Sequence, residues 1–244
     1  MLTWSRWKES RPLTAMTVLM IAGVTLLWVV VSQEMNKEEK SMTSQREEAV
    51  VSAITVDDLA KVSRTKVFFG HQSVGMNVLD GVADVYRVHS MTVPSIEQGG
   101  TWPDQDGGFI DHAFIGENEK PALKVHDFDA KMRSGIGRQV DVAMMKFCYI
   151  DIKANTDIDA LFATYRETMA ALQRDFPEVT FIYVTVPLTT EQGLPSKLKS
   201  LIAGSNGYGA ADNAARERLN SLIRRERAGR GARHAAGPGR WLPG

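Results

Sequence analysis

Apolar and polar positions follow two kinds of pattern in the central part of the chain. A short apolar run at residues 66–69 is followed, after a four-residue turn, by valines and leucines at helical spacing from Val74 to Val85. A continuous apolar run is typical of a strand buried on both faces, and the helical repeat is typical of an amphipathic helix that covers it. The pattern therefore predicts a strand, a turn and a helix in immediate succession.

The same alternation continues to residue 225 and predicts an α/β fold. Further strands are expected at residues 91–94, 140–147 and 179–186, and helices at residues 74–86, 121–132, 158–176 and 212–225. Strands that alternate with helices predict a parallel sheet with helices on both faces, a three-layer α/β/α arrangement. A helix-capping pattern at residues 55–58 places the start of this domain near residue 54.

A long uncharged stretch precedes this domain. Residues 13–31 hold no charged side chain, and a helix of that length spans about 28 Å, close to the thickness of a bilayer core. We therefore expect a transmembrane signal anchor at residues 13–32, with the basic residues 1–12 in the cytoplasm. A polar stalk at residues 33–53 would then carry the domain, residues 54–223, on the periplasmic or extracellular side. A cleavable signal peptide is the alternative, although no small-x-small cleavage site follows Val31.

Charge and cysteine usage limit the partners. The formal net charge is zero, but residues 1–12 carry +2 and residues 224–244 carry +5, so the residues between them carry −7. An acidic central domain argues against nucleic acid as a partner, because phosphate binding needs a positive field. A single cysteine, Cys148, excludes an internal disulfide and a multi-cysteine metal site.

We expect no metal ion and no cofactor. Three aspartates, Asp104, Asp106 and Asp111, lie close together in the sequence, but they lack the terminal glutamate of a Ca²⁺-binding loop. A polar surface loop accounts for them.

The last 21 residues differ in composition from the rest. Seventeen of residues 224–244 are Arg, Gly, Ala or Pro, and none is β-branched. We expect this tail either to be disordered or to be the translation of a shifted reading frame. Its histidine, His234, has no carboxylate three residues before it.

Ser73 is the candidate nucleophile. It lies in the turn between the first strand and its helix, so it belongs at the carboxyl edge of the sheet, beside the free N–H groups of the helix's first turn. A serine needs a general base to act at neutral pH. The candidates are His71, two residues before Ser73, and His112, in a Gly- and Asp-rich loop expected at residues 99–118.

Two polar residues are candidate substrate ligands. Asn118 carries a neutral amide with two donors, which suits the stabilisation of an oxyanion. Lys146 lies near the carboxyl end of an apolar strand, where it would bind an anionic group of a substrate or the acidic Asp151. Alternatively, Lys146 reaches solvent or forms a structural ion pair.

These residues together resemble the SGNH/GDSL-type hydrolases. The resemblance spans roughly residues 60–223 and rests on Gly-x-x-Ser at residues 70–73, on Gly-x-Asn at residues 116–118, and on the strand at residues 141–147 with residues 148–151 after it. It implies a flavodoxin-like parallel sheet and Ser73 as the nucleophile.

The same resemblance implies roles for two further residues. The backbone N–H of Gly116 would serve the oxyanion hole, and Asp151 would stand in the third motif. The first and third motifs depart from the family pattern, and the carboxyl-terminal Asp-x-x-His that supplies acid and base in this family has no counterpart.

The sequence thus predicts a membrane-anchored hydrolase that cleaves esters through an acyl-enzyme. Its substrate would be a small molecule or an acylated carbohydrate of the cell envelope, and the sequence makes no prediction of oligomeric state. Two other hypotheses are an anchored binding or scaffolding domain that has lost catalysis, and a truncated copy of an active enzyme whose last strand is gone.

Overall fold

The computed structural model describes residue 51 and residues 53–99, 107–189 and 209–235, with no side chains from residue 229 onward. The chain divides into two units, Met1–Thr55 and Val56–Gly244. All the helices and strands that follow belong to the second unit.

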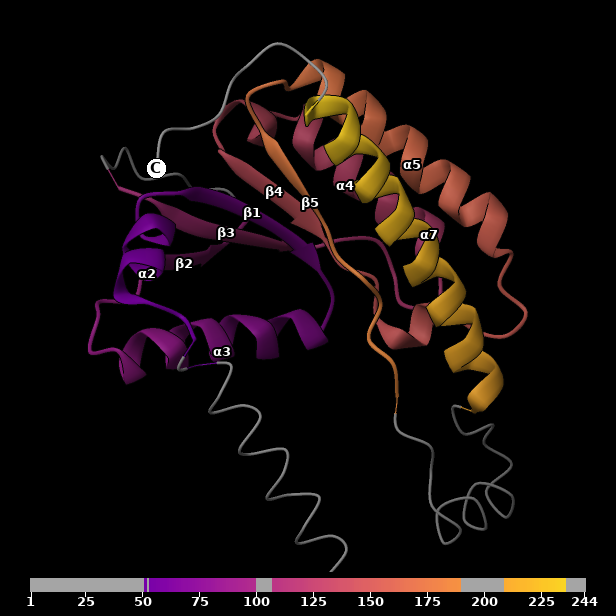
Figure 1. The fold of residues 1–244 in the computed structure, drawn as a ribbon, viewed down its shortest axis with the longest axis horizontal. Helices are drawn as coiled ribbons and strands as arrows, with labels where there is room; N and C mark the ends of the chain where they lie inside the picture. The colour runs from indigo at the N-terminus through magenta and orange to yellow at the C-terminus, as the bar shows by residue number, and fades with distance from the viewer. Residues whose placement is uncertain (1–50, 52, 100–106, 190–208, 236–244) are drawn as a thin grey trace, which may run out of the picture. The chain divides into compact units, whose positions relative to one another are not determined.

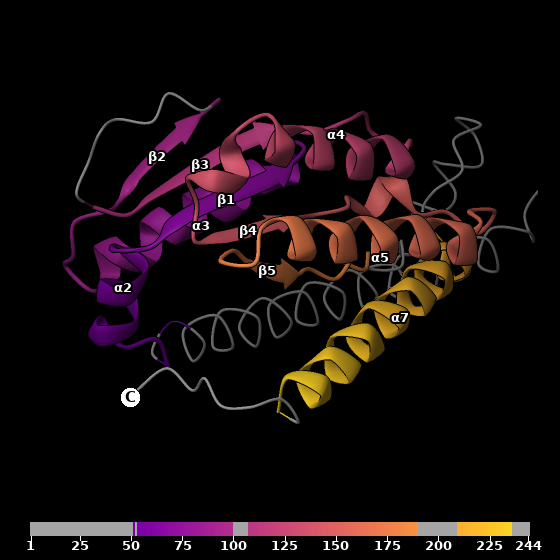
Figure 2. The ribbon, with the colours of Figure 1, turned by 90° about the horizontal axis from the view of Figure 1, so that it is seen from above.

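A parallel five-stranded sheet forms the centre of the second unit (Figures 1 and 2). The strands are β1 (Lys66–His71), β2 (Ser95–Gln98), β3 (Phe109–Phe114), β4 (Val142–Met145) and β5 (Thr180–Tyr183). They are arranged in the order β2-β3-β1-β4-β5, and every neighbouring pair is parallel. The sequence prediction of an α/β fold with a parallel sheet is therefore confirmed.

Helices lie on both faces of this sheet (Figure 1). They are α2 (Val56–Val62), α3 (Val74–Val88), α4 (Pro121–Arg133), α5 (Ile158–Asp175) and α7 (Ala210–Ala235), with short 3₁₀ turns at Ile136–Arg138 and Tyr149–Asp151. One core cluster joins α4, α5 and α7 to the sheet through residues such as Phe68, Phe128 and Leu219. A smaller cluster joins α3 to the other face through Val67, Phe69 and Leu79.

Three of the four predicted strands lie where they were expected. β1, β4 and β5 fall within or close to the predicted ranges, because their residues are nearly continuous apolar runs. The strand expected at residues 91–94 is wrong, since β2 begins at Ser95 instead. Pro94 has no N–H group to donate to a neighbouring strand, and this favours a start after it.

β3 is the element that the sequence pattern missed. Its residues were assigned to a loop because Asp111 and His112 interrupt the apolar run, yet both are buried in the strand. Asp111 accepts a hydrogen bond from the N–H of Gly99 at 3.1 Å, and His112 bonds to a histidine of β1. Asp104 and Asp106 lie outside the described residues.

The helices begin and end close to their predicted positions except at the carboxyl end. Asp157 caps α5 by accepting from the N–H of Ala160, as is common for an aspartate at that position. Helix α7 continues to Ala235, so the prediction that a disordered tail begins at residue 224 is wrong for residues 224–235. Arginine and alanine are strong helix formers, and they dominate these residues.

Polar side chains of α7 fix this helix to the loops after β4 and β5. Arg216 is fully buried and donates to the carbonyl of Tyr149 and to the hydroxyl of Thr189, both at 2.9 Å. Asn220 accepts from the N–H of Val186 at 2.7 Å and donates to its carbonyl at 2.9 Å. The side-chain amide of Asn220 thus provides hydrogen-bond partners for both the N–H and the carbonyl of Val186, in the segment that follows β5.

None of the helices within the described ranges has the length and hydropathy that crossing a bilayer requires. The anchor expected at residues 13–32 lies outside those ranges, as does the stalk expected at residues 33–53 except for residues 51 and 53.

Candidate active site

Ser73 lies at the carboxyl edge of the sheet, as predicted. It caps the amino terminus of α3 directly after β1, its side chain is exposed, and its hydroxyl makes no capping hydrogen bond. The chain passes from β1 to β3 on one side and later returns to β4 on the other side. Ligands of open α/β sheets bind where the strand order reverses in this way, outside the carboxyl ends of the strands.

Gln72 joins the turn of Ser73 to the loop after β3. Its amide nitrogen donates to the carbonyls of Ile115 and Gly116, at 3.0 and 2.9 Å. The two loops that would form the site are therefore held side by side by one side chain. The sequence analysis did not single out Gln72, because a glutamine in a turn gives no sign of which carbonyls it will reach.

Gly116 does not supply the donor that the family resemblance implied. Its N–H donates to a carboxylate oxygen of Asp127 on α4, at 2.9 Å, so this hydrogen is already engaged. Gly116 has a φ of +51°, and an added Cβ would lie 2.6 Å from the backbone nitrogen of Lys124. Glycine is thus required here for a tight turn against α4, and the oxyanion role expected for Gly116 does not fit this arrangement.

The amide of Asn118 is oriented by a buried ion pair. Lys124 of α4 is fully buried; its ammonium donates to Oδ1 of Asn118 at 3.0 Å and to Oδ2 of Asp151 at 2.6 Å. Because an ammonium only donates, the oxygen of Asn118 must face Lys124. The NH₂ group of this exposed residue is left pointing away from Lys124 as a donor.

Asp151 is buried and holds loops together. One carboxylate oxygen accepts from the N–H of Glu119 at 2.9 Å, and the other accepts from the N–H of Cys148 at 2.6 Å as well as from Lys124. The residue therefore links the loop after β3, the loop after β4 and helix α4. Lys124 was not predicted, since a lysine on a charged helix resembles a solvated residue in the sequence.

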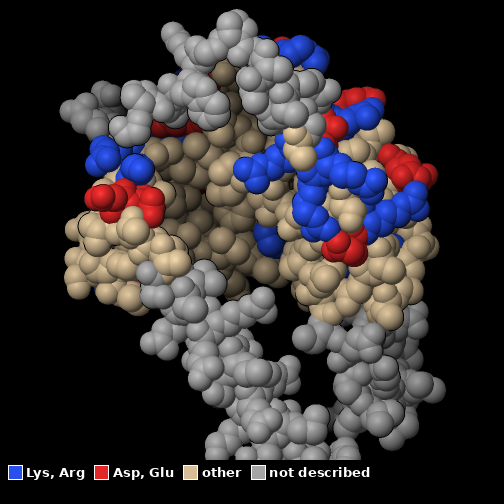
Figure 3. Space-filling model, in the orientation of Figure 1, with Lys and Arg blue, Asp and Glu red and all other residues tan. Residues whose placement is uncertain are grey.

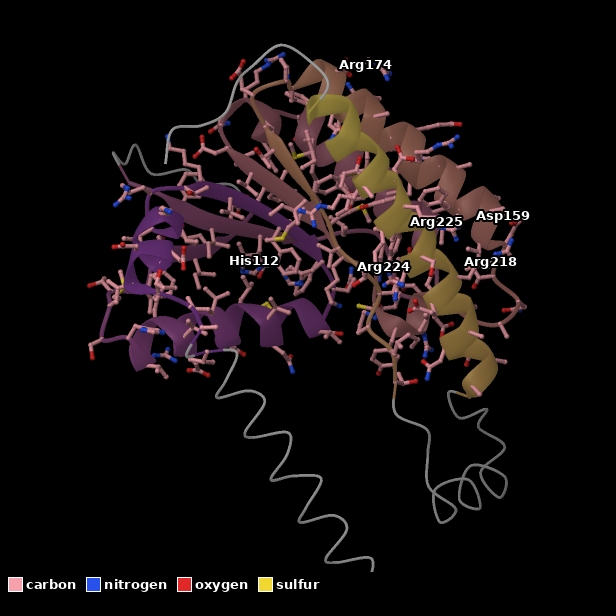
Figure 4. All side chains as sticks on the ribbon, in the orientation of Figure 1. His112, Asp159, Arg174, Arg218, Arg224 and Arg225 are labelled. Atoms are coloured by element: carbon pink, nitrogen blue, oxygen red, sulfur yellow. The ribbon has the colours of Figure 1, made fainter. Side chains whose placement is uncertain are left out.

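His71 and His112 pair with each other, and Figure 4 shows His112 between the sheet and α3. Nε2 of His71 lies 3.1 Å from Nδ1 of His112, and Nδ1 of His71 lies 2.8 Å from the carbonyl of Gln72. A carbonyl only accepts, so Nδ1 of His71 carries a hydrogen, and the Nε2 of a neutral His71 accepts from His112. This tautomer leaves the Nε2 of His112 with an uncommitted lone pair.

Burial controls the protonation of this pair. It lowers the pKa of His71, and the nearby charges of His112 and Lys146 lower it further, against a hydrogen bond to the carbonyl of Gln72 that raises it. Burial also lowers the pKa of His112. Both imidazoles are thus favoured in the neutral form. The His71 ring packs on Gly75 of α3, where an added Cβ would lie 2.1 Å from Cγ of the ring.

Lys146 lies directly after β4, beside the end of β1. Its N–H continues the ladder by donating to the carbonyl of Gly70 at 3.0 Å. Its ammonium has only long contacts, 3.4 Å to the carbonyl of Phe147 and 3.9 Å to Sγ of Cys148. Burial lowers the pKa of Lys146, as does the charge of Lys124, while Cys148 and Asp151 oppose this shift.

The described residues place no base in hydrogen bond to Ser73. Ser73, Asn118 and Lys146 follow strands at the carboxyl edge of the sheet, where His71 ends β1. The hydrogen bonds of the two histidines, however, are to each other and to the carbonyl of Gln72, and not to Ser73. Nor does any group of three His, Cys, Asp or Glu in the described ranges suit a metal ion. His234 falls within α7, where its side chain is not described.

A comparison with models of known protein families finds no match for this chain, and a comparison with curated proteins finds none either.

Proposed function

We propose that this chain is a membrane-anchored serine hydrolase that resembles the SGNH type and cleaves ester bonds on the outer side of the membrane. The observation that carries the proposal is the position of Ser73. It is an exposed serine at the amino terminus of a 15-residue helix, directly after the central strand of a parallel sheet, with its hydroxyl not used as a cap. A nucleophile placed in this way lies at the positive, amino-terminal end of the helix dipole, which favours negative charge that develops there.

The strand order supports the resemblance. A flavodoxin-like sheet has the order 2-1-3-4-5, and β3-β1-β4-β5 corresponds to its first four positions, with β2 added outside β3. The fifth position would lie beyond β5. The carboxyl-terminal Asp-x-x-His of the resembled family has no counterpart in the sequence.

The chemistry would proceed through an acyl-enzyme. Ser73 Oγ attacks the carbonyl carbon of the ester while its proton passes to a base, and the oxygen of the tetrahedral intermediate gains negative charge. The NH₂ of Asn118 is placed to stabilise that charge. The N–H groups of Gly75 and Met76 at the start of α3 already donate to the carbonyls of Gln72 and Ser73, at 2.7 and 3.0 Å. The alcohol then leaves, and water releases the acid and restores Ser73.

His112 is the candidate base within the described residues. The tautomer set by Gln72 and His71 leaves its Nε2 with a lone pair, whereas both ring nitrogens of His71 are engaged. Catalytic hydrogen bonds are often long without substrate and shorten in the complex.

One observation favours a different class of function. Within the described ranges Ser73 makes no hydrogen bond to a histidine or a carboxylate, which is what a binding or scaffolding domain that has lost catalysis would show. The ester assay below separates the two functions.

The test is hydrolysis of p-nitrophenyl acetate and butyrate by the full chain. We expect Ser73→Ala to abolish turnover and Asn118→Ala to reduce kcat by about 10²–10³, as for loss of one oxyanion donor. Asn77→Ala, at an exposed asparagine of α3, is the matched control and should leave kcat unchanged. Turnover that survives Ser73→Ala, or no turnover by a folded chain, would reject the hydrolase.

A further inference from the structure

Lys146 is a buried cation that forms no ion pair with a carboxylate of the described residues. Its side chain is 6% exposed, so it does not reach solvent as a surface lysine does. The contacts of its ammonium are a carbonyl at 3.4 Å and a thiol sulfur at 3.9 Å, both longer than an ordinary charge-assisted hydrogen bond. A buried ammonium is costly unless it is paired, so its place requires an explanation.

The carboxylate nearest to this ammonium is already engaged. Asp151 accepts hydrogen bonds from Lys124, Glu119 and Cys148. Among the described residues, the ion pair that Asp151 forms is with Lys124 and not with Lys146. Among the described residues, Lys146 therefore forms no ion pair of its own, although the charge of Asp151 raises its pKa.

A histidine pair and the amino terminus of a helix lie on the same side of the sheet as Lys146. Val142 and Met144 of β4 pack with the cluster on the α3 face, and alternation along the strand places Lys146 on this same face. The histidine pair lies on it too, and the charge of Lys146 acts on His71. The amino terminus of α3, with its positive dipole, packs on the ring of His71 through Gly75.

The surface of the domain is hollowed on the side that Figure 3 shows. The hollow lies between α3 and α7 and is lined mostly by uncharged side chains, with Lys or Arg atoms visible inside it.

We propose that Lys146 forms an anion subsite beside Ser73, which binds a carboxylate or phosphate group carried by the ester substrate. This inference rests on the proposed function, and it adds the class of substrate. An ammonium is a compact charge with three donors and accepts either oxyanion. The substrate class is thus an anionic ester, with its charged group a short distance from the scissile bond.

The first experiment tests binding without catalysis. The full chain with Ser73→Ala is titrated with succinate and, separately, with inorganic phosphate, by isothermal titration calorimetry at low salt. We expect saturable binding of at least one anion that weakens at least tenfold on Lys146→Met. Lys153→Met, which removes a half-exposed lysine of the same loop that pairs with Glu119, should leave it unchanged.

The second experiment tests the effect on turnover. We compare kcat/KM for p-nitrophenyl acetate with that for the mono-p-nitrophenyl ester of succinic acid, which adds one carboxylate. The succinate ester should be preferred, and Lys146→Met should reduce this ratio of kcat/KM values at least tenfold. Lys146→Arg, which keeps the charge, should retain the preference in part.

The outcomes separate the two proposals. Anion binding that depends on Lys146 in a folded chain without esterase activity would reject the hydrolase and keep the subsite. Esterase activity with no preference for the charged ester, together with no anion binding that depends on Lys146, would reject the subsite and keep the hydrolase. A thermal unfolding curve for each variant shows that loss of binding is not loss of folding.

Discussion

The buried ion pair of Lys124 and Asp151 allows a quantitative prediction, because the chain contains a matched exposed pair. Lys124 and Lys120 each lie 2.6 Å from a carboxylate oxygen, of Asp151 and Glu117 respectively. The side chains of the first pair are fully buried, whereas those of the second are about 60% exposed. The two pairs therefore share a distance and differ in solvation.

We predict that Lys124→Met destabilises the domain far more than Lys120→Met. Methionine keeps most of the volume of lysine but removes the charge, so Asp151 is left buried with two backbone N–H donors. Removing one partner of a buried pair costs about 3–5 kcal/mol. An exposed pair contributes about 0–1 kcal/mol. Lys120→Met should therefore lower the free energy of unfolding by no more than about 1 kcal/mol.

The assay is urea unfolding of the two variants and the unchanged chain, followed by far-ultraviolet circular dichroism. With a slope of about 2 kcal/mol per molar urea, the midpoint for Lys124→Met should fall by about 1.5–2.5 M and that for Lys120→Met by less than 0.5 M. Equal shifts for the two variants would contradict the reasoning, because burial would then not decide the cost. An unchanged midpoint for Lys124→Met would show that the ion pair does not form.

Three further predictions concern the turn of Ser73 and the histidine pair. Gly75→Ala should destabilise the domain by about 1–3 kcal/mol, because its Cβ would lie 2.1 Å from the His71 ring. In Gly81→Ala on the same helix, the added Cβ meets nothing within 4 Å and should stabilise the domain by about 0.5–1 kcal/mol. Thermal melting that ranks the two variants the other way would refute the packing of His71 on Gly75. Gln72→Leu should lower kcat for ester hydrolysis by at least tenfold, since the loops after β1 and β3 lose their link; unchanged kcat would show that the link is not needed. The folded state lowers the pKa of His71 and His112, so below about pH 6.5 the unfolded chain binds more protons than the folded chain. The stability from this pair should be complete above that pH and fall as the solution is made more acidic, with a shallower fall in His112→Asn. Urea midpoints that do not differ between pH 7.5 and pH 5.0 would contradict this.

The first strand, its turn and its helix could be predicted from the sequence because local pattern and tertiary position agree there. β1 is apolar on both faces, α3 begins at Val74 as expected, and Ser73 falls between them. β3 could not be predicted in this way. Its polar residues are acceptable in a buried strand only because Gly99 and His71 supply partners, and such partners are visible only in three dimensions.

The candidate site was predictable in its position and not in its connections. The sequence indicated that Ser73 and Lys146 would meet at the carboxyl edge of the sheet, since both follow parallel strands. It did not indicate that Gln72 joins two loops, or that Lys124 is buried, because a helix with several charged residues is usually solvated on the side that carries them. Long-range hydrogen bonds of this kind have no local sequence pattern.

Covalent labelling tests the central claim, that Ser73 is an activated nucleophile, most directly. The full chain is treated with a fluorophosphonate probe, digested and mapped by peptide mass spectrometry, with Ser73→Ala as the control and circular dichroism to show that both proteins are folded. We predict one adduct on Ser73 that is absent from the control. A folded chain that acquires no adduct, or whose adduct lies on another residue and persists in the control, would contradict the account.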